Sequence, residues 1–370
     1  MKPFIPDTLP LENIDYKRLI TLVGKANQEL AEYNGLMQAM SNPTLLLSPL
    51  TREEAVLSSK IEGTQATAVE VLEHEAGEVY DERKETDIKE IQNYRKALTK
   101  AEEQAKEFGI TLGLLLELHK ILMDSVRGEN KSPGNFRKDQ NWIGPYKCPI
   151  EKATFVPPSP LILEEHLRYW ENYMKIEDFD LLAQTAIIHA QFEILHPFKD
   201  GNGRIGRLII PLFLYSRGAL IRPMFYLSNY LEENRTEYYA RLKAISDKRD
   251  WNGWIEFFLK GIIEQARMNI IKTRAILELY DETLKKIIDV TRSQYASQLI
   301  DAFYDRPIFK VNELAERLGI PKPTIVGLIG KLHEEKILTL LREGSGRRPA
   351  LYAFYEIINI AEGTEVLSHR

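Results

Sequence analysis

The residues best suited to chemistry lie in the stretch HPFKDGNGRIGR, which runs from His196 to Arg207. It gathers one imidazole, one carboxylate, three glycines, one asparagine and two guanidinium groups. The DGNG segment favours backbone angles that neither a regular helix nor a strand provides. RIGRLIIPLFLYSRG then resumes an apolar helical spacing. The glycines are therefore predicted at a helix amino terminus, where free N–H groups and the helix dipole bind anions.

The charged residues around this turn indicate a polyphosphate ligand. Arg204 and Arg207 fall in the first helical turn, where the dipole disfavours cations unless a strong anion compensates. Asp200 is placed to bind Mg²⁺, which combines one or two carboxylates with phosphate oxygens. His196 can take a proton near neutral pH. These are the parts of a phosphoryl- or nucleotidyl-transfer site. The ordinary alternative is a polar helix cap with a solvated arginine pair.

The stretch resembles the signature of the Fic family, HxFx(D/E)GNGRxxR, at every defined position. The resemblance implies transfer of AMP from ATP to a Ser, Thr or Tyr hydroxyl of a target protein, which could be the chain itself. His196 would be the base and Asp200 would hold Mg²⁺. The resemblance assigns further ATP contacts to Gly201, Asn202 (on the α-phosphate), Gly203, Arg204 (on the β-phosphate), Gly206 and Arg207 (on the γ-phosphate). Because relatives transfer phosphate, UMP or phosphocholine, a different transferred group is an alternative.

A second motif, LSSKIEG, resembles the inhibitory pattern of the same family, (S/T)xxxE(G/N), at Ser58, Glu62 and Gly63. By this resemblance the Glu62 carboxylate would pair with Arg207 and compete for the guanidinium that the γ-phosphate needs. Inhibition would then act within the chain. The ordinary alternative is a helix end with Gly63 as its cap. The resemblance also raises removal of AMP as a second activity, which the sequence leaves open.

Two further stretches carry weaker signals. KATFVPPSP resembles the family's flap, which aligns the target segment by strand pairing, and this predicts contacts from Thr154, Phe155 and Val156. The alternative is a hairpin that only caps the bundle. EYYARL corresponds to a family segment near the adenine, which points to Tyr238 and Tyr239 as ATP contacts. Aromatic residues at helical spacing also build cores, so a structural role is the alternative for both tyrosines.

Helices must position these residues. Apolar residues three or four apart predict helices over 53–63, 85–109, 114–126, 161–175, 180–195, 204–218, 235–247 and 254–290. The stretch 180–195 is apolar almost all round, which is typical of a helix at the centre of a bundle. Residues 131–160 are rich in proline and predict a loop or small hairpin.

The carboxy-terminal segment predicts a winged helix. VNELAERLG and KPTIVGLIGKLHEEK read as two short helices around IPKP, and ILTLLRE and ALYAFYE read as two strands joined by GSGRRP. Arg342, Arg347 and Arg348 cluster at the wing, yet residues 291–370 are close to charge-neutral. DNA-binding domains are usually more basic. A protein-interaction or dimerisation role is therefore favoured over DNA binding.

The expected fold is mainly α: a Fic helical bundle with a small β-hairpin flap, followed by a winged helix-turn-helix domain. The expected domains are 1–110 with the inhibitory helix, 111–265 as the catalytic core, 266–295 as a linking helix, and 296–370 as the winged helix.

Composition and targeting signals complete the prediction. The net charge of −5 gives no global attraction to nucleic acid or anionic lipid. The single Cys148, and the lack of a signal peptide or membrane span, predict a cytoplasmic location. The prediction is an autoinhibited protein adenylyltransferase that uses ATP and Mg²⁺, and a homodimer is compatible with it. The competing hypothesis is a nucleotide-sensing DNA-binding regulator.

Overall fold

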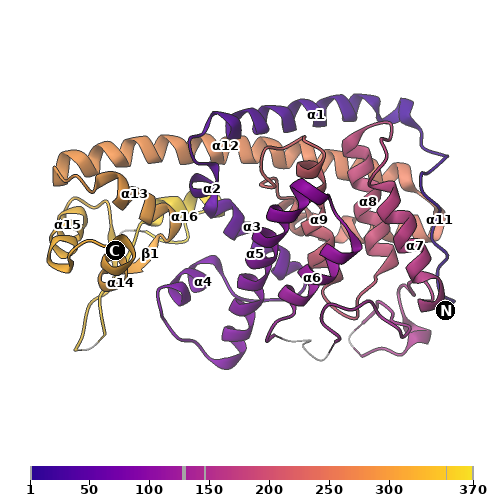
Figure 1. Ribbon diagram of the computed structural model, residues 1–370, viewed down its shortest axis with the longest axis horizontal. Helices are drawn as coiled ribbons and strands as arrows, with labels where there is room; N and C mark the ends of the chain where they lie inside the picture. The colour runs from indigo at the N-terminus through magenta and orange to yellow at the C-terminus, as the bar shows by residue number, and fades with distance from the viewer. Residues whose placement is uncertain (1, 127–130, 146, 347, 369–370) are drawn as a thin grey trace. The chain divides into compact units, whose positions relative to one another are not determined.

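The computed structural model describes residues 2–126, 131–145, 147–346 and 348–368. The described chain is mainly helical with one small sheet (Figure 1). Its elements are, in order, α1 (Tyr16–Ala39), α2 (Pro43–Leu46), α3 (Ser48–Ile61), α4 (Ala68–Glu75), α5 (Glu82–Phe108), α6 (Leu112–Leu122), η1 (Ile150–Lys152), α7 (Pro160–Tyr173), α8 (Leu181–Leu195), α9 (Asn202–Ser216), α10 (Ser228–Glu233), α11 (Arg235–Lys248), α12 (Trp251–Thr291), α13 (Ala296–Asp305), β1 (Ile308–Lys310), α14 (Val311–Leu318), α15 (Lys322–Glu334), β2 (Thr339–Arg342), β3 (Leu351–Ala353) and α16 (Tyr355–Glu362). Within these residues, no helix has the length and apolar character needed to cross a membrane.

The chain forms two compact units, each assembled from separate stretches of sequence. The first contains Met1–Gly35, Leu57–Thr64 and Lys89–Arg267, and the second contains Leu36–Val56, Gln65–Ile88 and Met268–Arg370. The segment Leu57–Thr64, which carries the predicted inhibitory motif, therefore belongs to the same unit as the HPFKDGNGRIGR stretch. These two units interleave along the chain, whereas the domains expected from the sequence are consecutive segments. The expected domain boundaries stay a prediction.

Helix α8 forms the centre of the first unit, as its apolar sequence predicts. Apart from Leu181 and Glu193, its residues are buried. It packs against α7, α9 and α11 (Figure 1). The Asp180 side chain caps its amino terminus by accepting hydrogen bonds from the backbone N–H groups of the first turn. Two buried indoles from α7 and α12 donate to its carbonyl oxygens. The centre of this unit is thus both apolar and hydrogen-bonded.

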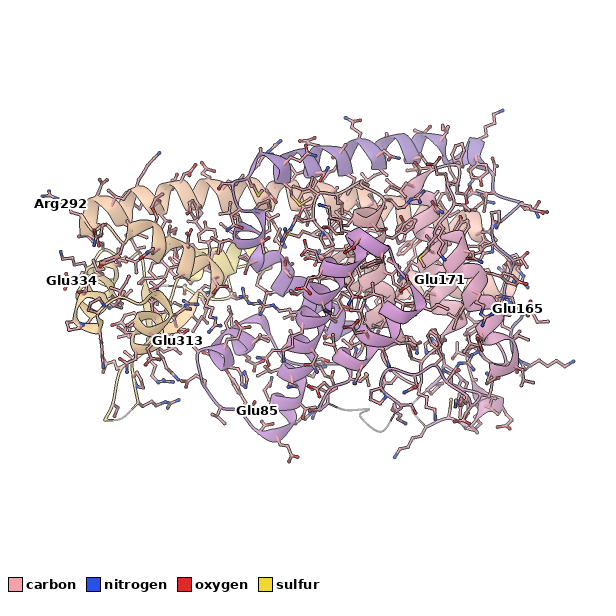
Figure 2. The ribbon with its side chains drawn as sticks, in the orientation of Figure 1. Glu85, Glu165, Glu171, Arg292, Glu313 and Glu334 are labelled. Carbon is pink, nitrogen blue, oxygen red and sulfur yellow. The ribbon has the colours of Figure 1, made fainter. Side chains whose placement is uncertain are left out.

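Helix α7, which packs beside α8, has one buried face and one exposed face. Leu163, Leu167 and Trp170 of α7 are buried, whereas Glu165 and Arg168 are exposed. Figure 2 shows the Glu165 carboxylate on the outer side of this helix. Spacing of three or four residues places these three apolar side chains on one side, whereas Leu161 and Tyr169 of the same helix are exposed. The sequence pattern therefore sets the orientation of α7.

The proline-rich segment between α6 and α7 is less regular than the expected hairpin. Its described part has one bridged pair, in which Ile143 and Phe155 exchange backbone hydrogen bonds of 2.9 and 3.1 Å. The short η1 helix lies between them. Pro157 and Pro158 follow the bridged Phe155 after one intervening residue, and proline has no N–H to extend a ladder. The flap is therefore a single bridge instead of two full strands.

The second unit contains the small sheet. Its strand order is β1-β3-β2, both pairings are antiparallel, and Ala353 of β3 pairs with Ile308 on one side and Thr339 on the other. Helices α14 and α15 fall where the sequence predicted two short helices, and Gly319 ends α14 in a left-handed conformation. Strand β1 and helix α16 were not anticipated. The assignment as a winged helix stays a prediction.

Candidate active site

The loop between α8 and α9 is built on two residues with left-handed backbone angles. His196 ends α8 with φ +45°, and Gly201 precedes α9 with φ +76°. Asn202 closes the loop, because its Oδ1 accepts from the Phe198 N–H at 2.8 Å and its Nδ2 donates to the Phe198 carbonyl at 2.9 Å. Both polar ends of the Asn202 amide therefore hold the loop. Its expected contact with an α-phosphate stays a prediction.

The imidazole of His196 has a defined tautomer. Its Nδ1 lies 3.3 Å from the Glu193 carbonyl oxygen, and a carbonyl can only accept, so Nδ1 carries the proton. Nε2 is left with a free lone pair. The pKa of His196 is lowered to about 4, mainly by burial and in part by the nearby charge of Arg137, whereas the hydrogen bond to the Glu193 carbonyl and the charges of Glu62 and Asp200 act in the opposite direction. The ring is neutral at pH 7 and can accept a proton.

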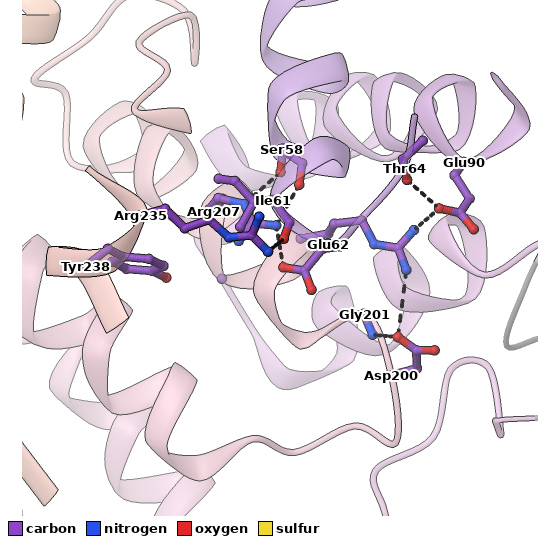
Figure 3. A network of polar contacts seen from close by, with 12 residues as sticks. Ser58, Ile61, Glu62, Thr64, Glu90, Asp200, Gly201, Arg207, Arg235 and Tyr238 are labelled. Atoms are coloured by element: carbon purple, nitrogen blue, oxygen red, sulfur yellow. Dashed lines mark hydrogen bonds and ion pairs between the residues drawn. The ribbon is translucent and has the colours of Figure 1, made fainter. Parts of the chain in front are cut away.

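Arg207 is buried and bound to the predicted inhibitory motif (Figure 3). Its Nε donates to the Ser58 hydroxyl at 2.8 Å, and its Nη2 donates to the Ser58 carbonyl at 2.8 Å and to Glu62 Oε1 at 2.7 Å. Burial by itself raises the pKa of Glu62, but the Arg207 guanidinium outweighs it and holds that pKa below its ordinary value. The ion pair expected between Glu62 and Arg207 is present.

The end of α3 places Glu62 at this position. The helix stops at Ile61, and Gly63 adopts φ +101°, a conformation that favours glycine. Arg235 donates to the Ile61 carbonyl at 2.7 Å and so satisfies one of the last helical carbonyls. Gly63 thus ends the helix, which is the helix-cap role considered for it from the sequence. The same turn directs the Glu62 side chain toward Arg207.

The Glu62 carboxylate fills the space above the glycine turn. A Cβ built on Gly203 would lie 2.2 Å from Glu62 Oε1 and 2.9 Å from Arg207 Nη1. Only a glycine leaves room here for a close negative oxygen. This oxygen lies at the first turn of α9, where backbone N–H groups and the dipole favour negative charge. The predicted anion position is therefore taken by a carboxylate of the same chain.

Arg204 is buried beside this position but is less fully bound than Arg207. Its Nη1 lies 3.6 Å from Glu90 Oε2, and its Nη2 lies 3.9 Å from Asp200 Oδ1. Within the described residues, its Nε and Nη1 have no hydrogen-bond partner. Buried donors without partners cost about 1–3 kcal/mol. The arginine therefore presents donors that an additional anion could satisfy.

Asp200 is half exposed, with 46% of its side chain accessible, and it accepts the Gly201 N–H at 2.7 Å. Among the described residues, no group of three or more His, Cys, Asp or Glu side chains could hold a metal ion. A metal at Asp200 would have to complete its coordination with oxygens of a ligand. Mg²⁺ commonly binds in this way, through one carboxylate, phosphate oxygens and water.

Gly206 and Tyr238 belong to the interior beneath the site. The Gly206 carbonyl accepts from His189 Nδ1 at 3.0 Å, so the Tyr238 hydroxyl donates to His189 Nε2 at 3.1 Å. His189 is fully buried, and burial lowers its pKa to about 3. Tyr238 is buried, whereas Tyr239 is exposed with the Arg235 guanidinium 5.9 Å from its ring. The roles of Gly206 and the two tyrosines in nucleotide binding stay predictions.

The predicted flap contacts also differ in environment. Thr154 is exposed, Phe155 is half-buried and Val156 is buried. The Val156 carbonyl accepts the backbone N–H of Phe4 at 2.9 Å, so an N-terminal residue of the same chain lies on that edge. Pairing of this segment with a target strand stays a prediction.

Two residues outside the predicted motifs, His119 and Arg137, also hold the site together. His119 of α6 donates from Nε2 to the Asp200 carbonyl at 3.0 Å and accepts the Gly134 N–H at 2.9 Å. Its ring stacks on Phe198 with centroids 3.9 Å apart. Arg137 binds the His196 carbonyl at 2.9 Å. A histidine within an apolar helix and an arginine within a proline-rich loop were the only local signals.

With this geometry, comparison with known proteins identifies the family. Residues 20–103 match the Fic/DOC family N-terminal domain and residues 109–214 match the Fic/DOC family. The chain belongs to the Fic/DOC family.

Relatives and solved structures agree with this assignment. A probable protein adenylyltransferase of Aquifex aeolicus is 28% identical over 211 residues, which cover 54% of this chain and 57% of that protein. The protein adenylyltransferase Fic of Drosophila virilis is 30% identical over 146 residues, covering 37% and 26%. The matches thus span little more than half of the bacterial relative and about a quarter of the fly protein.

The fold is shared with solved Fic proteins. The crystal structure of a Fic family protein from Desulfovibrio desulfuricans has a TM-score of 0.60 at 19% identity, covering 95% of this chain and 98% of that one. A fragment of Fic-1 from Caenorhabditis elegans has a TM-score of 0.51 at 19% identity, covering 70% and 75%.

Proposed function

We propose that this chain transfers AMP from ATP to a hydroxyl group of a protein. The observation that carries the proposal is the Glu62 carboxylate, which lies against Gly203 at the start of α9 and binds Arg207. A negative oxygen held by a helix terminus and a buried guanidinium is the environment that a phosphate needs. The printed names of the Aquifex and Drosophila relatives support the same activity.

The phosphates of ATP would take the position that Glu62 now holds. Arg207 would bind the γ-phosphate once Glu62 has moved, and Arg204 would bind the β-phosphate through its Nε and Nη1, which make no hydrogen bond within the described part of the chain. Backbone N–H groups at Gly203 and its neighbours would contact the α-phosphate oxygens. These donors are fixed before the reaction begins, so they stabilise developing charge without reorganising. Mg²⁺ held by Asp200 would neutralise phosphate charge when bound.

The reaction would begin with His196. Its Nε2 lone pair accepts the proton of the target hydroxyl, and the hydroxyl oxygen attacks the α-phosphorus. A new oxygen–phosphorus bond forms, the bond from the α-phosphorus to the bridging oxygen breaks, and pyrophosphate leaves. The proton stays on His196 until water or product removes it. Because the free imidazole is neutral at pH 7, the base requires no prior deprotonation.

The structure described here would be the inhibited state. Glu62 occupies Arg207 and the space above Gly203, so a γ-phosphate and the Glu62 carboxylate compete for one site. A cytoplasmic location, a homodimer and the removal of AMP by the same site remain proposals that rest on the sequence alone.

The test is transfer of label from ATP to protein. Glu62→Gly protein is incubated with Mg²⁺ and either α-labelled or γ-labelled ATP. Label from the α-phosphate should enter protein, and label from the γ-phosphate should not. Glu62→Gly with His196→Ala should incorporate neither. Incorporation of γ-label would identify phosphate transfer and reject the proposal.

A DNA-binding regulator is not favoured. Arg342 and Arg348 of the predicted wing both bind the Glu78 carboxylate of the same unit, which also binds Lys310. Arg347 lies outside the described residues. A duplex would have to displace Glu78 from three cations before it could bind at the wing.

A further inference from the structure

The guanidinium of Arg137 connects the predicted flap with the loop that carries His196. It is buried, with an exposed fraction of 3%. Its Nε donates to the His196 carbonyl at 2.9 Å, and its Nη2 donates to the Pro158 carbonyl at 2.6 Å. Longer hydrogen bonds reach the carbonyls of Leu195 at 3.4 Å and Asp139 at 3.3 Å. One side chain thus joins three backbone segments.

These acceptors explain why a cation lies at this position. Leu195 and His196 are at the carboxyl end of α8, where carbonyl groups have no helical N–H partner and the dipole is negative. His196 also has a positive φ of 45°, a conformation that a residue with a side chain keeps only when its surroundings hold it. The backbone N–H of Arg137 adds a bond to the Pro197 carbonyl at 2.8 Å. Arg137 therefore holds this end of the helix in its strained form.

Burial of the Arg137 guanidinium at this position is unfavourable for the stability of the fold. The hydrogen bonds that the guanidinium makes within the described chain go to neutral carbonyls, and burial lowers the pKa of Arg137 to about 10. A buried cation without a carboxylate partner is rare unless its position matters. The hydrogen bonds of Arg137 therefore indicate that this side chain sets the position of the backbone segments that it joins.

We propose that Arg137 is a positioning residue, which fixes the His196 imidazole relative to the flap segment that contains Pro158. The proposal rests on the proposed AMP transfer, in which the flap aligns the target and His196 takes its proton. Both partners of the proton transfer are then located by the same guanidinium. A shift of about 1 Å between reacting groups can lower a rate on the order of a hundredfold.

The charge of Arg137 gives a second, separable effect. Among the charged groups that act on His196, Arg137 lowers the pKa of the ring, whereas Glu62 and Asp200 raise it. Arg137→Lys keeps the charge but loses the planar arrangement of donors that reaches several carbonyls. Arg137→Met loses both. The two variants therefore distinguish geometry from charge.

The experiment compares these variants in the Glu62→Gly protein. Arg137→Lys should lower kcat for AMP incorporation by about tenfold to a hundredfold and leave the KM for ATP within about twofold, because Arg204 and Arg207 are untouched. Arg137→Met should lower kcat at least as much and raise the pKa of His196. That pKa is followed by NMR of the ring proton, which is assigned by its absence in His196→Ala. Arg317→Met, which removes a partly buried arginine of the second unit, is the matched control.

The results separate this proposal from the proposed function. An inactive Glu62→Gly protein would reject AMP transfer, while the His196 ring signal of Arg137→Lys and Arg137→Met would still report on the position of the imidazole. An unchanged kcat in Arg137→Lys, or an unchanged ring signal in both variants, would overturn the role of Arg137. A loss of kcat no greater than that of Arg317→Met, at equal loss of thermal stability, would also overturn it.

Discussion

Replacing Glu62 with glycine should increase the affinity of the chain for Mg-ATP. The substitution removes one charge-assisted hydrogen bond of 2.7 Å between Glu62 and Arg207, and leaves the two bonds from Arg207 to Ser58 in place. Such a bond contributes about 1.5–3 kcal/mol when buried. Because 35% of the Glu62 side chain is exposed, solvent screening reduces this to about 1–2 kcal/mol. A γ-phosphate no longer has to displace this bond.

This free energy corresponds to an increase in ATP affinity of about fivefold to thirtyfold. Isothermal titration calorimetry with Mg-ATP measures it, and ADP is the internal control. Since ADP has no γ-phosphate to bind Arg207, its affinity should increase less. Glu62→Gln keeps an acceptor but removes the charge, so it should give an intermediate gain. Glu164→Gln, on the exposed face of α7, should change nothing.

Two results would refute this reasoning. Equal affinities of the wild-type and Glu62→Gly proteins for ATP would show that Glu62 does not compete with the nucleotide. An equal gain for ADP and ATP would show that the competition does not involve the γ-phosphate. Neither result could be attributed to unfolding, since α3 ends at Ile61 and glycine fits the turn that follows.

Three other predictions follow from the site. Arg204→Met should weaken Mg-ATP binding by about tenfold or more, since it removes buried donors that make no hydrogen bond to any described residue; an unchanged Kd contradicts this. The rate of Glu62→Gly should stay constant from about pH 5.5 to about pH 8, because the pKa of His196 is about 4 and the ring is the neutral base above it; a tenfold rise per pH unit near pH 6.5 would contradict this. Gly201→Ala should lower the free energy of unfolding by about 1–2 kcal/mol because of its φ of +76°, whereas Gly24→Ala within α1 should not; equal thermal melts of the two variants would contradict this.

Those parts of the site that depend on local sequence could be predicted. The glycine turn, the start of α9 and the buried α8 follow from residues next to one another. The pairing of Glu62 with Arg207 was also expected, although it joins residues 145 positions apart. That expectation came from the resemblance of two motifs and not from any pattern of spacing.

Other parts depend on packing that the sequence does not display. His119 and Asp200 are 81 positions apart, and Arg137 and His196 are 59 positions apart. The sequence does not indicate the partner in either contact, because a backbone carbonyl accepts a hydrogen bond whatever its residue type. The side-chain amide of Asn202 is a further example, because the sequence is compatible with its facing a ligand or the loop. In the structure the amide binds the backbone of Phe198. Residue type gives the chemistry available, and the tertiary fold selects the partner.

The location of the nucleotide tests the central claim most directly. A crystal structure of Glu62→Gly soaked with ATP and Mg²⁺ should show the triphosphate at the first turn of α9, with its γ-phosphate on Arg207 and its β-phosphate on Arg204. A triphosphate bound elsewhere, with Arg207 still held only by Ser58, would contradict the account.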